Sequence, residues 1–158
     1  MSLTIVPLQP IERGQMNVMR AQGAVMALGL IVPAIIAEVA LADRLPLHGA
    51  IAGAAILIGI WLAVIAPPRR WRHWGYAFTG RELHVAHGWW TRVHTIVPVT
   101  RVQHIDVAQG PFERSFGVAR LMLHTAGTDQ TVVTLPGISR ATAEEVRDAI
   151  RERIGSAA

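Results

Sequence analysis

The chain has 158 residues, of which 51% are hydrophobic and only 16% charged, so it is more apolar than an average soluble domain. It contains no cysteine, which excludes a disulfide framework, a thiolate metal site and a cysteine nucleophile. The basic residues are all arginine, and the net charge of +4 is too small to indicate a nucleic-acid-binding surface by itself.

Two long apolar runs come first along the chain. Residues 21–37 and 45–68 contain no Asp, Glu, Lys or Arg. Each run offers roughly 18–22 helical residues, enough at about 1.5 Å per residue to reach across the ~30 Å hydrocarbon core of a bilayer. Backbone groups in lipid must be hydrogen-bonded internally, so both runs are expected to be helices. The sequence therefore predicts a two-span transmembrane hairpin over 21–68, preceded by an N-terminal segment over 1–20.

The arginines lie mainly on the two outer flanks of this hairpin, and its short loop holds Arg44 alone. By the positive-inside rule, both termini are expected on the cytoplasmic side of the membrane. Ala40-Leu41-Ala42 resembles a signal-peptide cleavage site. A second apolar run follows at once, however, so a retained anchor is the favoured interpretation.

The segment after the second run is rich in arginine and tryptophan, which are residues of a membrane interface. Arginine is attracted to anionic headgroups, and the indole keeps its apolar ring in the interface while its N–H stays in water. The residues predicted at this level are Arg69, Arg70, Trp71, Arg72 and Trp74. A topology signal and anchor is the simpler interpretation, and a site for anionic lipid is the alternative.

Glu38 is an acid near the end of the first run, where an ionisable residue is a candidate functional group. It lies about one helical turn from the loop, so it can extend to the interface or pair with Arg44. The alternative is an ion or proton site. In the second run Gly49 and Gly53 lie four residues apart and are followed by Ala55, Gly59 and Ala63, small residues that favour close packing within the hairpin over a homo-oligomer interface.

The pattern changes in the last part of the chain, which is predicted to be a folded cytoplasmic domain over 69–158. Hydrophobic and polar residues alternate with period two, and Gly or Pro separates the segments, which predicts short antiparallel strands. The expected strands are residues 76–80, 81–88, 92–99, 101–107, 118–126 and 130–135. Residues 112–117 are too few for a strand and are expected to form a helical turn or tight loop.

The C-terminal segment predicts an amphipathic helix. Ala143, Val146, Ile150 and Ile154 form one apolar stripe, and Ser139 is placed to cap its N-terminus. A small antiparallel sheet needs its apolar face covered, so this helix is expected to lie across an open edge or mouth of a barrel. The fold class is therefore α+β: a two-helix transmembrane hairpin followed by an antiparallel β-barrel or sandwich capped by a C-terminal helix.

Four short motifs are similar to the signature of the membrane-anchored bacterial pleckstrin-homology-like family (YdbS type). They are Arg101-Val-Gln-His-Ile, Gln109-Gly-Pro, Arg114-Ser-Phe-Gly117 and Thr125-Ala-Gly127. The resemblance implies a partly open pleckstrin-homology-like barrel with a C-terminal helix, located in the bacterial inner membrane. It also implies a scaffold without enzymatic activity, sometimes encoded in a pair with a larger relative. That fold usually has seven strands, whereas six are predicted, so a long strand is divided or the predicted boundaries are displaced.

The histidines of the domain do not have the spacing of a metal or catalytic site. His84 and His87 are three residues apart on one strand and so face opposite ways. No H-E-x-x-H, G-x-S-x-G or paired-acid pattern occurs. We therefore expect no catalytic residue, no metal and no cofactor, and histidines that face solvent or form structural hydrogen bonds.

Two main hypotheses remain for function. As a scaffold, the domain offers loops and a strand edge to a protein partner, either a paired pleckstrin-homology-like membrane protein or a second copy. As a lipid module, it binds anionic headgroups. A third hypothesis, a component of an oligomeric transporter or channel, rests on Glu38 and the two spans. Neither nucleic acid nor a small-molecule substrate is expected.

Four residues are candidates for contact with a partner or with lipid. They are Trp89, Trp90, Arg101 and Arg114. The structural alternatives are an indole that closes the end of the barrel, and arginines that bind backbone carbonyls or a carboxylate such as Asp106 or Glu113.

Overall fold

The computed structural model of the chain describes residues 6–42, 48–126 and 132–156. The described residues form two compact units, one within 1–15 and 70–158 and the other within 16–69. This division differs from the predicted boundaries at 20 and 68, because part of the N-terminal segment belongs to the C-terminal domain.

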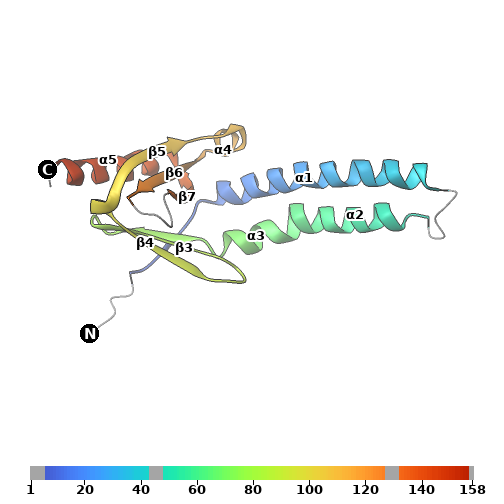
Figure 1. Ribbon diagram of the computed structural model, residues 1–158, viewed down its shortest axis with the longest axis horizontal. Helices are drawn as coiled ribbons and strands as arrows, with labels where there is room; N and C mark the ends of the chain where they lie inside the picture. Colours follow the sequence, from blue (N-terminus) through green and yellow to red (C-terminus); the bar gives the residue numbers. More distant parts are fainter. Residues whose placement is uncertain (1–5, 43–47, 127–131, 157–158) are drawn as a thin grey trace. The chain divides into compact units, whose positions relative to one another are not determined.

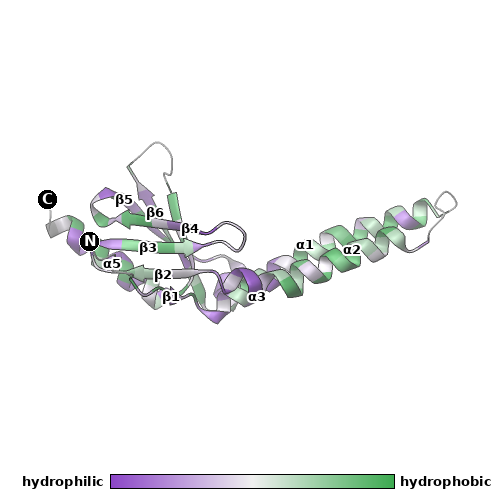
Figure 2. Ribbon diagram, turned by 90° about the horizontal axis from the view of Figure 1, so that it is seen from below, coloured by the Kyte–Doolittle hydropathy of each residue, from purple (hydrophilic) through white to green (hydrophobic). Residues whose placement is uncertain are grey.

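Two long apolar helices account for residues 16–69. Helix α1 covers Arg13–Ala40 without interruption at Pro33, and the second helix consists of α2 (Ala50–Ile60), the π-helical turn η1 (Trp61–Ile65) and α3 (Ala66–Trp71). Both are long and apolar enough to cross a membrane. Only 11% of the apolar window of α1 and 22% of that of Ala50–Trp71 is buried, so these are not core helices of a soluble domain. Apolar residues run along most of both helices (Figure 2).

The two helices approach each other closely at glycines. A Cβ on Gly23 would collide with the backbone oxygen of Leu62, and a Cβ on Gly59 would lie 3.1 Å from the Cβ of Ala27. Gly59 thus packs within the hairpin, as predicted. Gly53, by contrast, has open space where a Cβ would point.

The π-helical turn has a cause in the sequence that follows it. Pro67 and Pro68 have no N–H to donate, and their rings crowd the carbonyl groups one turn earlier. A wider turn accommodates this crowding: the Ala66 N–H donates to the carbonyl oxygen of Trp61, five residues back.

The domain is an open sandwich of two antiparallel sheets with a helix at its C-terminal end (Figure 1). The first sheet has the order β1-β2-β3-β4 and the second the order β5-β6-β7. The strands are β1 (Gln9–Pro10), β2 (Gly75–Phe78), β3 (Glu82–His87), β4 (Val93–Pro98), β5 (Val102–Ala108), β6 (Val118–Thr125) and β7 (Val132–Ser139). A 3-10 turn, η2 (Val99–Arg101), joins the sheets, and the short helix α4 (Pro111–Ser115) confirms the predicted helical turn.

The described part of the chain contains one strand more than the sequence predicts. The additional strand is β1, which precedes both apolar helices: Gln9 pairs with Tyr76 and Pro10 with Gly75. The seventh strand of the fold therefore comes from the N-terminal segment and not from the division of a long strand.

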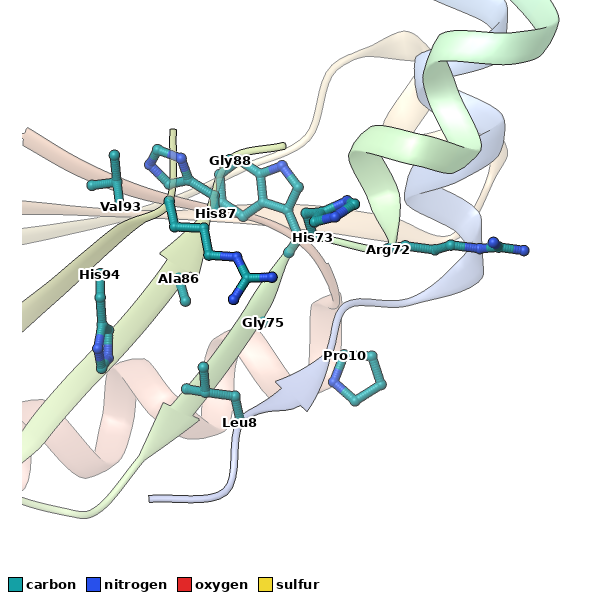
Figure 3. A pocket seen from close by; sticks show the side chains of 12 residues that line it. Leu8, Pro10, Arg72, His73, Gly75, Ala86, His87, Gly88, Val93 and His94 are labelled. Atoms are coloured by element: carbon teal, nitrogen blue, oxygen red, sulfur yellow. The ribbon is translucent and has the colours of Figure 1, made fainter. Parts of the chain in front are cut away.

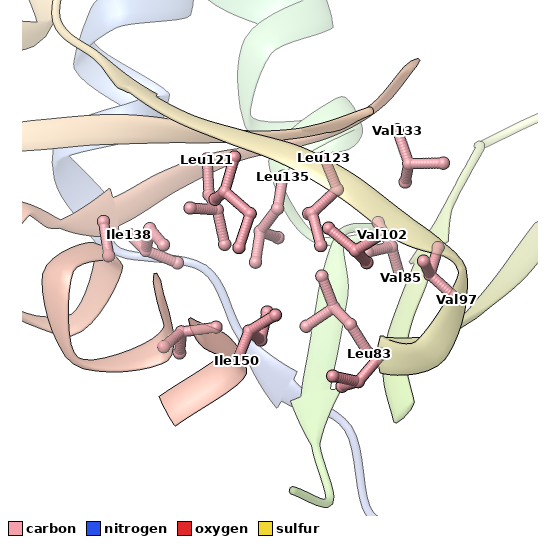
Figure 4. Packing of buried hydrophobic residues seen from close by; sticks show 14 of the residues in the cluster. Leu83, Val85, Val97, Val102, Leu121, Leu123, Val133, Leu135, Ile138 and Ile150 are labelled. Carbon is pink, nitrogen blue, oxygen red and sulfur yellow. The ribbon is translucent and has the colours of Figure 1, made fainter. Parts of the chain in front are cut away.

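The core lies between the two sheets (Figure 4). Leu83 and Val85 of β3 face Leu121 and Leu123 of β6 in one cluster, and each is at most 1% exposed. Ile11 joins this cluster from the N-terminal segment and is 2% exposed. Burial of Ile11 is the physical reason why this segment folds with the domain.

Helix α5 (Arg140–Ser156) completes the domain as predicted. Its first turn is capped by Ser139, whose Oγ accepts a hydrogen bond from the Thr142 N–H at 3.0 Å. Ala143, Val146 and Ile150 are buried, whereas Ile154 is 37% exposed. The apolar stripe thus contacts the core over its first three positions.

Candidate functional site

The segment that follows α3 is built into the domain. The indole N–H of Trp71 donates hydrogen bonds to the backbone oxygens of Glu12 at 3.0 Å and Ile11 at 3.2 Å. Trp71 and Trp74 also pack against the hydrophobic core. These tryptophans therefore hold the domain together, and the predicted headgroup level of residues 69–74 stays a prediction.

A groove of about 460 Å³ opens beside this segment (Figure 3). It is bounded by the N-terminal segment, the residues after α3, and the ends of β3 and β4. Its basic lining residues are Arg72, His73, His87, Arg92 and His94. Leu8, Trp74 and Val93 contribute apolar surface. Among the residues that the structure describes, no acidic side chain lines this groove.

A second hollow, of about 290 Å³, adjoins the groove. The two share Trp74, His87 and Gly88. The rings of Trp74 and His87 are tilted by 31° with their centroids 4.7 Å apart, and this pair forms a wall that both hollows share. The other lining residues of the second hollow are Arg70, Trp89 and Trp90.

Trp89 and Trp90 form the turn between β3 and β4, where they are 48% and 88% exposed. Their rings meet edge to face with centroids 5.9 Å apart. The turn begins at Gly88, which has a φ of +110° and no room for a Cβ beside the Thr91 carbonyl oxygen. Neither indole is buried, and contact of this pair with a partner or with lipid stays a prediction.

Arg101 and Arg114, both selected by sequence motif, do not line the groove or the hollow. Arg101 lies in η2 and Arg114 in α4, and both are exposed. A different arginine, Arg120, has the structural role: its Nη2 lies 2.6 Å from Oε1 of Glu113. Glu113 is 6% exposed, so Arg120 neutralises a buried carboxylate.

The histidines form local pairs on the sheets. His104 and His124 both contact the Asp106 carboxylate, at 2.8 and 3.2 Å, and His84 lies 3.4 Å from Glu82. Among the described residues, no group of three or more His, Cys, Asp or Glu side chains is arranged to hold a metal ion. The Asp106 carboxylate thus pairs with two histidines.

Glu38 has a structural role at the end of the apolar helices. Its carboxylate accepts hydrogen bonds from the backbone N–H of Gly49 and, at 2.7 Å, from that of Ala52. Both donors belong to the start of α2, which has no acidic residue in its own first turn. A negative charge stabilises a helix N-terminus, so Glu38 of one helix caps the other. The predicted partner Arg44 lies outside the described residues.

Two apolar helices, an open antiparallel sandwich and a C-terminal helix together define a membrane-associated protein with a pleckstrin-homology-like domain. The sequence profile of the Bacterial PH domain family matches residues 24–154, and the chain belongs to this family. The match confirms the resemblance seen in the sequence motifs.

A curated relative supports the same assignment. The chain is 33% identical, over 99 residues, to the UPF0699 transmembrane protein YdbS of Bacillus subtilis (strain 168). This match covers 62% of the present chain and 60% of that relative, less than two thirds of its length. No solved structure matches the chain significantly.

Proposed function

We propose that the protein is a non-enzymatic, membrane-anchored interaction module that presents its domain to a protein partner at the cytoplasmic face of the bacterial inner membrane. The observation that carries this proposal is the open edge of β4, which pairs with β3 alone within the first sheet. The N–H and C=O groups on the other edge of such a strand can pair with a strand from another chain.

The side chains of β4 are consistent with an edge that a partner covers. Val93 and Ile96 are 37% and 49% exposed. No Asp, Glu, Lys or Arg occurs within Val93–Pro98, although exposed edge strands are usually protected by charge. An added strand would lie beside these apolar side chains, one on each face of the sheet, and would cover part of each, which would stabilise the complex.

The membrane anchor favours a partner that is itself held in the membrane. Two anchored domains are confined to one surface, which raises their effective concentration and makes a small interface sufficient. We therefore expect the partner to be a second PH-like membrane protein or another copy of this chain. The arginines on the outer flanks of the apolar helices support a cytoplasmic position for the domain.

Purification from native membranes in mild detergent tests this proposal. The wild-type chain should retain a stoichiometric membrane-protein partner or self-associate. Ile96→Lys, which places a charge on the β4 edge, should reduce that association about tenfold or more. The matched control is Ile154→Lys, since Ile154 is 37% exposed and belongs to α5 and not to β4. Absence of any such complex, or equal loss in both variants, would refute the scaffold.

A further inference from the structure

The basic groove is tied to the end of an apolar helix by the chain itself. Arg72, His73 and Trp74 line the groove and come directly after Trp71, the last residue of the helix Ala50–Trp71. Since an extended chain covers at most about 3.6 Å per residue, Trp74 lies within roughly 11 Å of that helix end. The headgroup layer on each side of a bilayer is about 5–8 Å thick. With the helix Ala50–Trp71 in a membrane, as predicted, the part of the groove lined by Arg72, His73 and Trp74 is expected at or just beyond the headgroups.

The charge of this region is suited to phosphate. Arg72 and Arg92 line the groove, and Arg70 lines the adjoining hollow. No acidic side chain among the described residues lines either of them. A guanidinium group binds a phosphate through two parallel N–H donors and keeps its charge at any physiological pH. Figure 3 shows His94 on one side of the groove and Arg72 on the other, with the Arg72 side chain extended away from the remaining labelled residues.

The tryptophans indicate that this phosphate belongs to a lipid. Trp89 and Trp90 are exposed in the turn that shares its hollow with Arg70, and Arg70 immediately precedes Trp71. Exposed indoles are unfavourable in water but favourable in the interfacial layer, where the ring contacts acyl chains and the N–H reaches water. These exposed indoles would not contribute to the binding of free phosphate.

We propose that the groove binds the phosphate of an anionic lipid headgroup through Arg72 and Arg92, with the Trp89–Trp90 turn inserted into the interface beside it. The groove and the turn would then contact the membrane in addition to the helices, and together they would fix the orientation of the domain relative to the membrane. The groove shares Val93 and His94 with the proposed docking edge of β4, but the inference is argued from the arginines and tryptophans and does not depend on a protein partner.

Binding can be measured with the full chain purified in mild detergent and stripped of native lipid. Soluble short-chain phosphatidylglycerol should bind, whereas short-chain phosphatidylcholine and inorganic phosphate at the same concentration should not. Arg72→Gln/Arg92→Gln should weaken phosphatidylglycerol binding about tenfold or more, because charge-assisted contacts to the phosphate are lost. The control Arg101→Gln/Arg114→Gln removes two exposed arginines elsewhere in the domain and should bind as the wild type does. Equal weakening in both pairs, or equally tight binding of inorganic phosphate, would overturn the proposal.

Insertion of the turn has a separate readout. The chain has no cysteine, so a nitroxide can be placed uniquely at Thr91→Cys beside the tryptophans, and at Arg81→Cys in the turn at the opposite end of β3. In phosphatidylglycerol-containing nanodiscs, the label at 91 should be more accessible to oxygen than to a polar nickel complex, and the label at 81 should show the reverse. Equal preference for the polar reagent at both positions would contradict insertion. Protein partners are absent from both assays, so failure here is distinct from failure of the scaffold.

Discussion

Trp71 and Glu12 are joined by a hydrogen bond, from the indole N–H to the backbone oxygen at 3.0 Å, although 59 positions separate them in the sequence. Both apolar helices lie between these two residues. The helices are thus an insertion between β1 and β2 of one domain and not an anchor attached to its N-terminus. The domain consequently depends on residues from both sides of the insertion.

This dependence predicts that Ile11→Ala destabilises the domain although Ile11 precedes both apolar helices. The side chain is 2% exposed in the core cluster, so its loss should cost about 2–5 kcal/mol. Ile154→Ala is the matched control because Ile154 is 37% exposed, and it should change the stability by about 1 kcal/mol or less. Thermal unfolding followed by near-ultraviolet circular dichroism in detergent measures both. Equal midpoints for the two variants would show that the N-terminal segment is dispensable.

The sequence predicts much of the fold because most of its elements are long enough to show a period. Strands β2 to β7 alternate over four to eight residues, and α5 carries both an apolar stripe and a capping serine. Strand β1 has only two residues, Gln9 and Pro10, and therefore no alternation. Its one local signal is Ile11, a single apolar residue whose partners in the core lie sixty or more positions away.

The candidate site is less predictable because the fold assembles it from distant segments. The arginines and tryptophans after α3 stand out in the sequence, and so do Trp89 and Trp90. Nothing in the sequence indicates that Leu8, Arg92 and His94 meet beside them in one groove. Motif resemblance instead selects Arg101 and Arg114, which the fold leaves elsewhere on the surface.

The cap on α2 predicts a local effect of Glu38. Glu38→Ala removes the acceptor for the Gly49 and Ala52 N–H groups, and loss of such a cap costs about 1 kcal/mol. Amide hydrogen exchange over residues 49–52 in nanodiscs should accelerate about five- to tenfold. Val39→Ala, an adjacent position that is 73% exposed, should leave the exchange unchanged. Unchanged exchange in Glu38→Ala would mean that the carboxylate does not cap the helix in the membrane.

The pair Glu113–Arg120 predicts an unusual order of stabilities. Arg120→Gln leaves the Glu113 carboxylate buried without its charged partner, which should cost about 1–3 kcal/mol at this partly exposed pair. Glu113→Gln/Arg120→Gln removes both charges and should be more stable than Arg120→Gln alone. Arg114→Gln on the same short helix, with an exposed side chain, should be near neutral. A double variant less stable than Arg120→Gln would show that the pair contributes little and the two side chains act separately.

Tyr76 predicts how the stability of the domain changes in alkali. Burial, and secondarily the nearby Glu12 carboxylate, raise the pKa of Tyr76 above its ordinary value of 10.0. The unfolded chain then loses this proton at lower pH than the folded chain. The stabilising contribution is complete below about pH 10 and is lost as the pH rises through the folded-state pKa.

This effect can be isolated because Tyr76 is the one tyrosine of a chain without cysteine or lysine. Absorbance at 295 nm during alkaline titration should show a single ionisation above pH 10 in the folded protein and near pH 10 in denaturant. Glu12→Gln should lower the folded-state midpoint only part of the way, since burial is the larger cause. Tyr76→Phe should remove the decline in unfolding midpoint that the wild type shows across this range. A folded-state midpoint equal to that in denaturant would mean that Tyr76 is fully solvated, and hence that the pairing of β1 with β2 beside it does not persist in solution.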